Sequence, residues 1–217
     1  MRFEKGACRG LDKAISMELT ASGTALIVID MQNSFCSEDG GCQKAGLPVE
    51  HLALAIEPCE RLITTARESK VPVIYTRYVL RSDYSDGGVI IHDLSPHLKE
   101  VGALIEDTWD IEVVTELKPA AGDLVIDKNR PSAFYAPEFE ATLAKLGVKN
   151  LVVCGVTTNC CVESTVRDAS QRDYKTFVVA DAVAEFEEDR HRIALQSMDR
   201  LFADVVTIAD VTAAWRG

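Results

Sequence analysis

Cys161 is the side chain in this sequence with the clearest capacity for nucleophilic chemistry. It follows the apolar run 151–154 and stands at the start of a segment of helical character. A thiol in the first turn of a helix lies near free backbone N–H groups and the positive end of the helix dipole, and both favour the thiolate over the thiol. We therefore predict that Cys161 is a nucleophile.

Two charged residues occupy comparable places in the chain. Asp30 ends a short apolar run, and Lys128 comes directly after another. If these runs are parallel strands, ligands bind beyond their carboxyl ends, at the point where the strand order reverses. There Asp30 can accept the proton of Cys161 and return it to a leaving nitrogen, while Lys128 favours the thiolate. Backbone N–H groups near Thr157 and Cys161 can stabilise the oxyanion that forms on attack at an amide carbon.

Each of these residues also has a purely structural interpretation. An aspartate after a strand commonly caps a turn, and Lys128 can be a solvated charge. Buried cysteines usually act as small inert apolar side chains, which is the interpretation we give to Cys59, Cys154 and Cys160. Cys160 and Cys161 cannot both face one pocket, and their spacing alone does not choose between them.

Apolar runs that alternate with helix-length amphipathic segments predict an α/β fold. Several runs are apolar throughout, as expected of parallel strands covered on both faces by helices. The expected strands are residues 25–29, 71–75, 123–126, 151–154, 176–180 and 205–208. The expected helices are residues 51–69, 137–146, 162–172 and 189–202. This alternation predicts one domain over residues 1–217, with a doubly wound, mainly parallel six-stranded sheet in the order 3-2-1-4-5-6.

Residues 77–122 interrupt the alternation of strands and helices. Turn-forming Ser, Asp and Gly residues gather at 82–88, and Thr-Trp-Asp follows at 108–110. We expect an excursion that helps to form the pocket wall and contributes to a subunit contact. Residues 1–22 are expected to form an N-terminal extension, to which we assign no function.

Composition and charge exclude several classes of partner. The chain has 217 residues, 47% of them hydrophobic, and a formal net charge of −11 that is spread along the sequence. An acidic surface of this kind does not favour nucleic acid or an anionic membrane as a partner. The sequence begins without the apolar core of a signal peptide, and no apolar run approaches the roughly 20 residues of a membrane span. We therefore expect a cytoplasmic protein.

The seven cysteines do not form a recognisable framework. Their number is odd, and no CxxC pair or matching histidine spacing accompanies them. This argues against a set of disulfides and against a zinc site. We expect free thiols in a reducing compartment.

Three sequence blocks together resemble the isochorismatase-like cysteine hydrolase superfamily. They are residues 27–33, Lys128 with residues 132–134, and residues 155–165, and the resemblance extends over about residues 24–211. It implies a catalytic triad of Asp30, Lys128 and Cys161, with Cys160 at a variable position. It also implies a non-proline cis peptide between Val156 and Thr157 that orients the oxyanion-hole amide.

The resemblance further indicates which branch of the superfamily this chain is similar to. A cysteine nucleophile implies C–N hydrolysis, because members that cleave the vinyl ether of isochorismate lack it. Residues 75–78 and the four histidines do not reproduce the metal site of nicotinamidases, so no metal and no organic cofactor are expected. Residues 108–110, 116–117 and 161–165 are most similar to ureide and carbamoyl amidohydrolases of the ureidoacrylate, N-carbamoylsarcosine and biuret types. These release ammonia through a covalent thiol intermediate, and the family resemblance implies a homodimer or homotetramer.

Residues near the three blocks are candidates for substrate binding because they offer polar donors or an aromatic wall. They are Gln32, Asn33, Phe35, Arg77, Arg130, Tyr135 and Thr158. An arginine in the pocket would suit a substrate carboxylate, whereas an uncharged ureide is favoured if neither Arg77 nor Arg130 enters it. The alternatives are an acyl amidase for a small acid amide of the maleamate or nicotinamide type, a redox-sensing thiol protein, and a non-catalytic binding protein.

Overall fold

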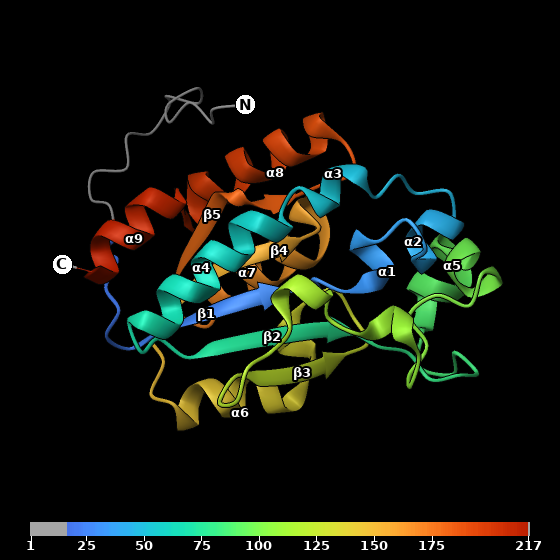
Figure 1. Cartoon of the computed structure of the whole chain (residues 1–217), viewed down its shortest axis with the longest axis horizontal. Coiled ribbons are helices and arrows are strands. Elements are labelled where there is room, and N and C mark those ends of the chain that lie inside the picture. Colours follow the sequence, from blue (N-terminus) through green and yellow to red (C-terminus); the bar gives the residue numbers. More distant parts are fainter. Residues whose placement is uncertain (1–16, 217) are drawn as a thin grey trace.

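A six-stranded parallel sheet forms the centre of the protein. In the computed structural model, which describes residues 17–216, the strand order is β3-β2-β1-β4-β5-β6 and every neighbouring pair is parallel (Figure 1). The strands are β1 Thr24–Ile29, β2 Val73–Tyr78, β3 Leu124–Lys128, β4 Asn150–Val156, β5 Lys175–Ala184 and β6 Asp204–Val206. The expected fold class and strand order are therefore confirmed. Cys8 and most of the expected extension 1–22 lie outside the described residues.

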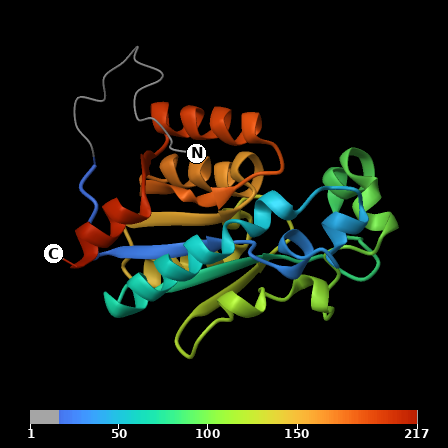
Figure 2. The same cartoon turned by 45° about the horizontal axis from the view of Figure 1, so that its top comes forward.

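Helices cover both faces of this sheet. They are α1 Asn33–Cys36, α2 Gly41–Lys44, α3 Glu50–Ala53, α4 Ile56–Glu68, α5 Pro96–Glu100, α6 Pro137–Lys145, α7 Glu163–Ser170, α8 Glu188–Leu201 and α9 Ile208–Arg216. Helices α4 and α9 pack against each other and against β5, while α7 and α8 pack together on the opposite side (Figure 2). None of the helices in the described part of the chain is both long and apolar enough to cross a membrane.

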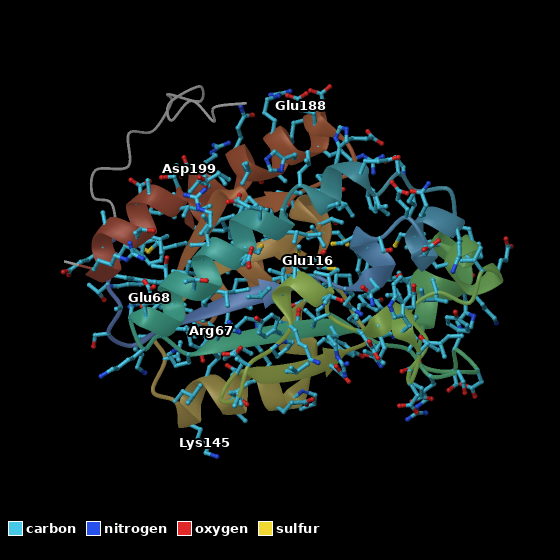
Figure 3. All side chains as sticks on the ribbon, viewed as in Figure 1. Arg67, Glu68, Glu116, Lys145, Glu188 and Asp199 are labelled. Atoms are coloured by element: carbon cyan, nitrogen blue, oxygen red, sulfur yellow. The ribbon has the colours of Figure 1, made fainter. Side chains whose placement is uncertain are left out.

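The apolar sequence of the strands explains the burial of the sheet. All six residues of β1 and all seven of β4 are buried, because these strands lie at the centre and helices cover them on both sides. Most charged side chains lie outside this core. Lys145 projects from the end of α6 and Glu188 from the start of α8 (Figure 3).

Several element boundaries differ from those expected. The region 51–69 is divided into α3 and α4, and β2 and β3 extend to Tyr78 and Lys128. The expected strand 205–208 ends at Val206, and α9 begins at Ile208. Thr207 and Asp210 exchange hydrogen bonds between side chain and backbone N–H, which is a capping arrangement that starts a helix.

The first part of the excursion 77–122 lies at the carboxyl ends of β1, β2 and β3, and its last residues return to the start of β3 at the opposite end of the sheet. In Figure 1 its green helix α5 stands beside α1 and α2, beyond the arrowheads of these strands. Asp110 fixes it there, because its carboxylate accepts the backbone N–H of Gly41 and of Leu104, each at 2.7 Å. The excursion and the segment after β1 therefore form one layer over this end of the sheet.

Candidate active site

Asp30 and Lys128 form a buried ion pair at the carboxyl ends of β1 and β3. The Lys128 Nζ donates to Asp30 Oδ2 at 2.6 Å, and both side chains are 0% exposed. The other carboxylate oxygen, Oδ1, accepts the Thr76 hydroxyl at 2.7 Å. Asp30 has a φ of 49°, in the left-handed region that aspartate tolerates better than most residues. The carboxylate is thus held in place by two neighbouring strands.

The Lys128 ammonium is held in its charged form. Its Nζ also donates to the Arg130 carbonyl oxygen at 3.1 Å and lies 4.8 Å from the centre of the Tyr78 ring. Burial lowers the pKa of Lys128, but the adjacent Asp30 carboxylate outweighs this and raises the pKa overall. A permanent positive charge therefore lies within the site at neutral pH.

Cys161 lies in a π-helical turn, Thr158–Val162, between β4 and α7, and its side chain is buried. A side-chain hydrogen bond with Cys160 and burial raise the pKa of Cys161, while the Lys128 ammonium lowers it; the net direction is upward. The sequence favoured a thiolate on the basis of the helix dipole, whereas the hydrogen bond with Cys160 and burial favour the thiol. A nucleophilic Cys161 would therefore have to release its proton during attack.

Cys160 differs from the inert buried residue expected from the sequence. Its side chain is exposed, and the hydrogen bond with Cys161 lowers its pKa. The two neighbouring thiols face different surroundings, and only Cys161 is enclosed. The interpretation of Cys59 and Cys154 as buried apolar side chains is confirmed.

The segment that carries Cys161 is tied to its neighbours at several points. The Thr165 hydroxyl donates to the Cys161 carbonyl oxygen at 2.7 Å and accepts the Ala133 N–H at 3.0 Å. The peptide between Val156 and Thr157 is cis, as the resemblance implied. Of the two amides expected to form the oxyanion hole, that of Cys161 belongs to the turn Thr158–Val162 and that of Thr157 directly precedes it.

Glu185, which the sequence did not single out, supports the same turn. It follows β5, is 4% exposed, and accepts the backbone N–H of Asn159 at 2.9 Å and of Phe186 at 3.0 Å. It also pairs with the Thr157 side chain, and burial raises its pKa. A single buried carboxyl group thus ties the residues that directly follow the cis peptide to the end of β5. No sequence signal marked it, since the expected strand ended five residues earlier.

Several residues that were expected to bind the substrate make other contacts in the structure. The Gln32 side chain donates to the carbonyl oxygens of Tyr78 at 3.0 Å and Ile111 at 3.2 Å, and accepts the Tyr78 N–H at 2.6 Å. The Asn33 side chain donates to the Trp109 carbonyl oxygen at 2.8 Å. Both amides therefore fasten the excursion to the segment after β1. Phe35 belongs to the apolar core.

Neither arginine is directed at the ion pair. Arg77 forms a two-point ion pair with Asp127, at 2.7 and 2.8 Å, because both project from the same side of neighbouring strands. The Arg130 guanidinium donates to the Asp86 carbonyl oxygen at 2.7 Å and lies against the Tyr135 ring. Tyr135 itself is 58% exposed and lines an outer hollow of about 460 Å³. These three residues therefore lie around the Asp30–Lys128 ion pair without contacting it through their side chains.

Thr158 is fully buried, and its hydroxyl lies 2.8 Å from Nδ1 of His191 on α8. Burial lowers the pKa of His191, so the imidazole is neutral at physiological pH. This contact joins α8 to the turn that carries Cys161. Thr158 is thus placed next to the reactive group, but its hydroxyl already has a partner.

Tyr78 is the most important residue of the candidate site that was not predicted from the sequence. The expected second strand ended at Tyr75, whereas β2 continues to Tyr78, which pairs in register with Lys128. Its ring covers the Lys128 ammonium and its hydroxyl is buried without a hydrogen-bond partner in the described part of the chain.

Among residues 17–216, no cluster of three or more His, Cys, Asp or Glu side chains is arranged to hold a metal ion.

Comparison with known proteins identifies the family of this chain. Residues 24–210 match the isochorismatase domain, which covers most of the chain. This chain belongs to the isochorismatase family. The match coincides with the region of resemblance expected from the three sequence blocks.

Individual members of the isochorismatase family extend the comparison. The ureidoacrylate amidohydrolase RutB of Azorhizobium caulinodans is 31% identical over 214 residues, which cover 92% of this chain and 93% of RutB. The crystal structure of a cysteine hydrolase from Pseudomonas syringae pv. phaseolicola 1448A has a TM-score of 0.85 and 32% identity, covering 93% of this chain and 96% of the other. The structure of the N-carbamoylsarcosine amidase of Thermoplasma acidophilum has a TM-score of 0.68 and 27% identity. The match covers 85% of this chain and 96% of the amidase.

Proposed function

We propose that this protein is a cysteine-dependent amidohydrolase that cleaves the C–N bond of a small ureide or carbamoyl compound and releases ammonia. The chain is a hydrolase by family, and its similarity to a ureidoacrylate amidohydrolase and an N-carbamoylsarcosine amidase supports carbon–nitrogen bonds as the target. The observation that carries the proposal is the buried Asp30–Lys128 pair next to the enclosed Cys161 thiol.

The first half of the reaction uses all three side chains. The Cys161 thiol transfers its proton to Asp30 as the sulfur attacks the ureido carbonyl carbon, and the Lys128 ammonium stabilises the negative charge on sulfur. Amides of Thr157 and Cys161 stabilise the oxyanion of the tetrahedral intermediate. Asp30 then returns the proton to the leaving nitrogen, so ammonia departs and a carbamoyl or acyl thioester remains.

In the second half a water molecule replaces the thiol. The Asp30 carboxylate removes a proton from water, and the hydroxide attacks the thioester carbon. The C–S bond breaks, the sulfur regains its proton from Asp30, and a carbamate or acid is released. A carbamate product decomposes further to an amine and carbon dioxide. None of these steps calls for a metal or an organic cofactor.

The proposal extends to the cellular setting of the reaction. A cytoplasmic location is supported by free thiols at every cysteine in the described residues. A homodimer or homotetramer, in which a neighbouring subunit helps to enclose the pocket, is proposed on the basis of family resemblance.

Ammonia release from a set of substrates tests the function. Ureidoacrylate, N-carbamoyl amino acids and biuret are compared with maleamate and nicotinamide, with EDTA present. We expect a ureide to be preferred, Cys161→Ala to abolish turnover, and the neighbouring substitution Cys160→Ala to change it by no more than a few-fold. Preference for maleamate or nicotinamide would contradict the ureide assignment, and full activity of Cys161→Ala would contradict the thiol mechanism.

A further inference from the structure

The hydroxyl group of Tyr78 is buried but has no hydrogen-bond partner among the described residues. The side chain is 5% exposed, so solvent does not satisfy the hydroxyl either. A buried polar group that lacks a partner costs free energy, on the order of 1–3 kcal/mol. A phenylalanine would fill the same space and present the same ring face to the Lys128 ammonium without this cost. The hydroxyl therefore calls for a reason other than packing.

The backbone of Tyr78 is held in place from both sides. The Gln32 side-chain amide accepts the Tyr78 N–H at 2.6 Å and donates to the Tyr78 carbonyl oxygen at 3.0 Å. Gln32 is itself 0% exposed and follows Asp30 by two residues. The position of the phenol is thus fixed relative to Asp30, as is required of a group that orients a ligand.

The Tyr78 side chain is close to the groups of the proposed reaction. Lys128 Nζ lies 4.8 Å from the centre of the Tyr78 ring and 2.6 Å from Asp30 Oδ2. Burial raises the pKa of Tyr78, and the nearby Cys161 raises it further. The phenol is therefore neutral across the physiological range and acts as a donor.

Strand order separates this donor from the oxyanion amides. Tyr78 ends β2 and Thr157 follows β4, and these strands lie on opposite sides of β1, which Asp30 follows. A carbonyl oxygen held by the amides of Thr157 and Cys161 thus lies on the β4 side. A substrate that extends from there across Asp30 would reach Tyr78.

We propose that the Tyr78 hydroxyl donates a hydrogen bond to a second oxygen of the substrate, separate from the oxygen of the carbonyl under attack. The preferred substrates are then bifunctional ureides such as acylureas, whose second carbonyl group lies beyond the ureido group, because neither Arg77 nor Arg130 is directed at the site to pair with a carboxylate. Simple ureas and amides lack this oxygen and leave the hydroxyl unsatisfied. The inference rests on the proposed amidohydrolase function and specifies its substrate class.

Tyr78→Phe tests the proposal, with Tyr75→Phe as the matched control. Tyr75 is a second buried tyrosine of β2, and its hydroxyl does have a partner, the Arg67 guanidinium at 3.4 Å. We expect Tyr78→Phe to lower kcat/KM for a bifunctional substrate by about 10- to 100-fold. Its Tm should stay the same or rise, because the lost hydroxyl had no protein partner. Tyr75→Phe should show the opposite, with a lower Tm and unchanged kcat/KM.

A pair of substrates separates this role from a general effect on catalysis. Each enzyme is assayed with the bifunctional substrate that the wild type cleaves best and with an analogue in which methylene replaces the second carbonyl. The proposal requires that Tyr78→Phe reduce the preference of the enzyme for the bifunctional substrate over its methylene analogue. It is overturned if kcat/KM stays within about threefold of wild type, or if both substrates are affected equally. If the wild type cleaves amides such as maleamate but no ureide, the proposed function fails, while the same comparison with maleamate still decides the role of Tyr78.

Discussion

The Thr76 hydroxyl donates to Oδ1 of Asp30 at 2.7 Å, on the carboxylate oxygen that the Lys128 ammonium does not contact. Each oxygen of the carboxylate is therefore held by a different strand, β2 for one and β3 for the other. A base that must accept a proton and return it benefits from a fixed orientation, because a small misplacement lowers the rate of transfer.

Thr76→Val should reduce kcat by about tenfold, since proton transfer by a positioned group typically contributes 10²–10⁴-fold and part of the positioning is lost. The valine side chain has a similar shape, so packing between the strands is kept. Steady-state kinetics with the preferred ureide measures the effect. Thr76→Ser retains the hydroxyl and should keep most of the activity; equal losses in both variants would contradict a role for the hydrogen bond.

Removing one partner of the Asp30–Lys128 pair should destabilise the fold more than removing both. Lys128→Met leaves an uncompensated buried carboxylate and is expected to lower the free energy of unfolding by roughly 3–5 kcal/mol. Asp30→Asn combined with Lys128→Met removes both charges and should lower it less than Lys128→Met alone, and therefore less than the sum of the single changes. Urea unfolding of the four proteins measures this coupling. Strict additivity would show that the two groups do not interact.

Stability should fall in alkaline solution because of buried thiols. Burial raises the pKa of Cys42 from 9.0 to about 12 in the folded state. The unfolded chain therefore loses this proton first, so the contribution to stability is complete below about pH 9 and is lost as the pH rises towards about 12. The slope attributable to the thiol is at most about 1.4 kcal/mol per pH unit.

Urea unfolding at intervals from about pH 7 to about pH 10.5 measures this decline. Cys42→Ala lacks the titrating group and should show a flatter profile than the wild type. Identical slopes for the two proteins would contradict the assignment to Cys42.

Glu185→Gln should impair catalysis through the turn that carries the nucleophile. Glutamine keeps one acceptor oxygen, so only one of the N–H groups of Asn159 and Phe186 retains its partner. We expect kcat to fall by about tenfold or more and the free energy of unfolding to fall by about 1–3 kcal/mol. Kinetics and thermal unfolding are measured together. Ile193→Gln, on the exposed side of α8, is the control for a polar substitution that touches none of these contacts.

Much of the fold follows from local sequence patterns. The continuous apolar runs of β1 and β4 identify them as central strands, and the helices between them fix the doubly wound order. Boundaries were harder to predict, because they depend on partners that are distant in sequence. Asp181 interrupts the apolar pattern of β5, yet the strand continues to Ala184 and the Asp181 carboxylate accepts the Ile208 N–H at 2.9 Å.

The positions of the candidate triad at strand ends could be predicted, but the contacts of the residues that surround it could not. Asp30, Lys128 and Cys161 each follow or end a recognisable strand, so topology alone brings them together. Gln32 and Arg77 lie near these positions in sequence, but neighbouring backbone and carboxylate groups satisfy them. The error at Tyr78 arose from one strand boundary, since a strand that ends at Tyr75 leaves Tyr78 in a loop.

The enclosure of the nucleophile also determines which molecules can complete the reaction. Cys161 is 5% exposed, and the Asp30 and Lys128 side chains are 0% exposed. In the proposed mechanism an acyl group forms on this enclosed sulfur, where water would reach it more readily than larger amines or alcohols. Such a geometry would favour hydrolysis of the proposed intermediate over acyl transfer to those larger nucleophiles.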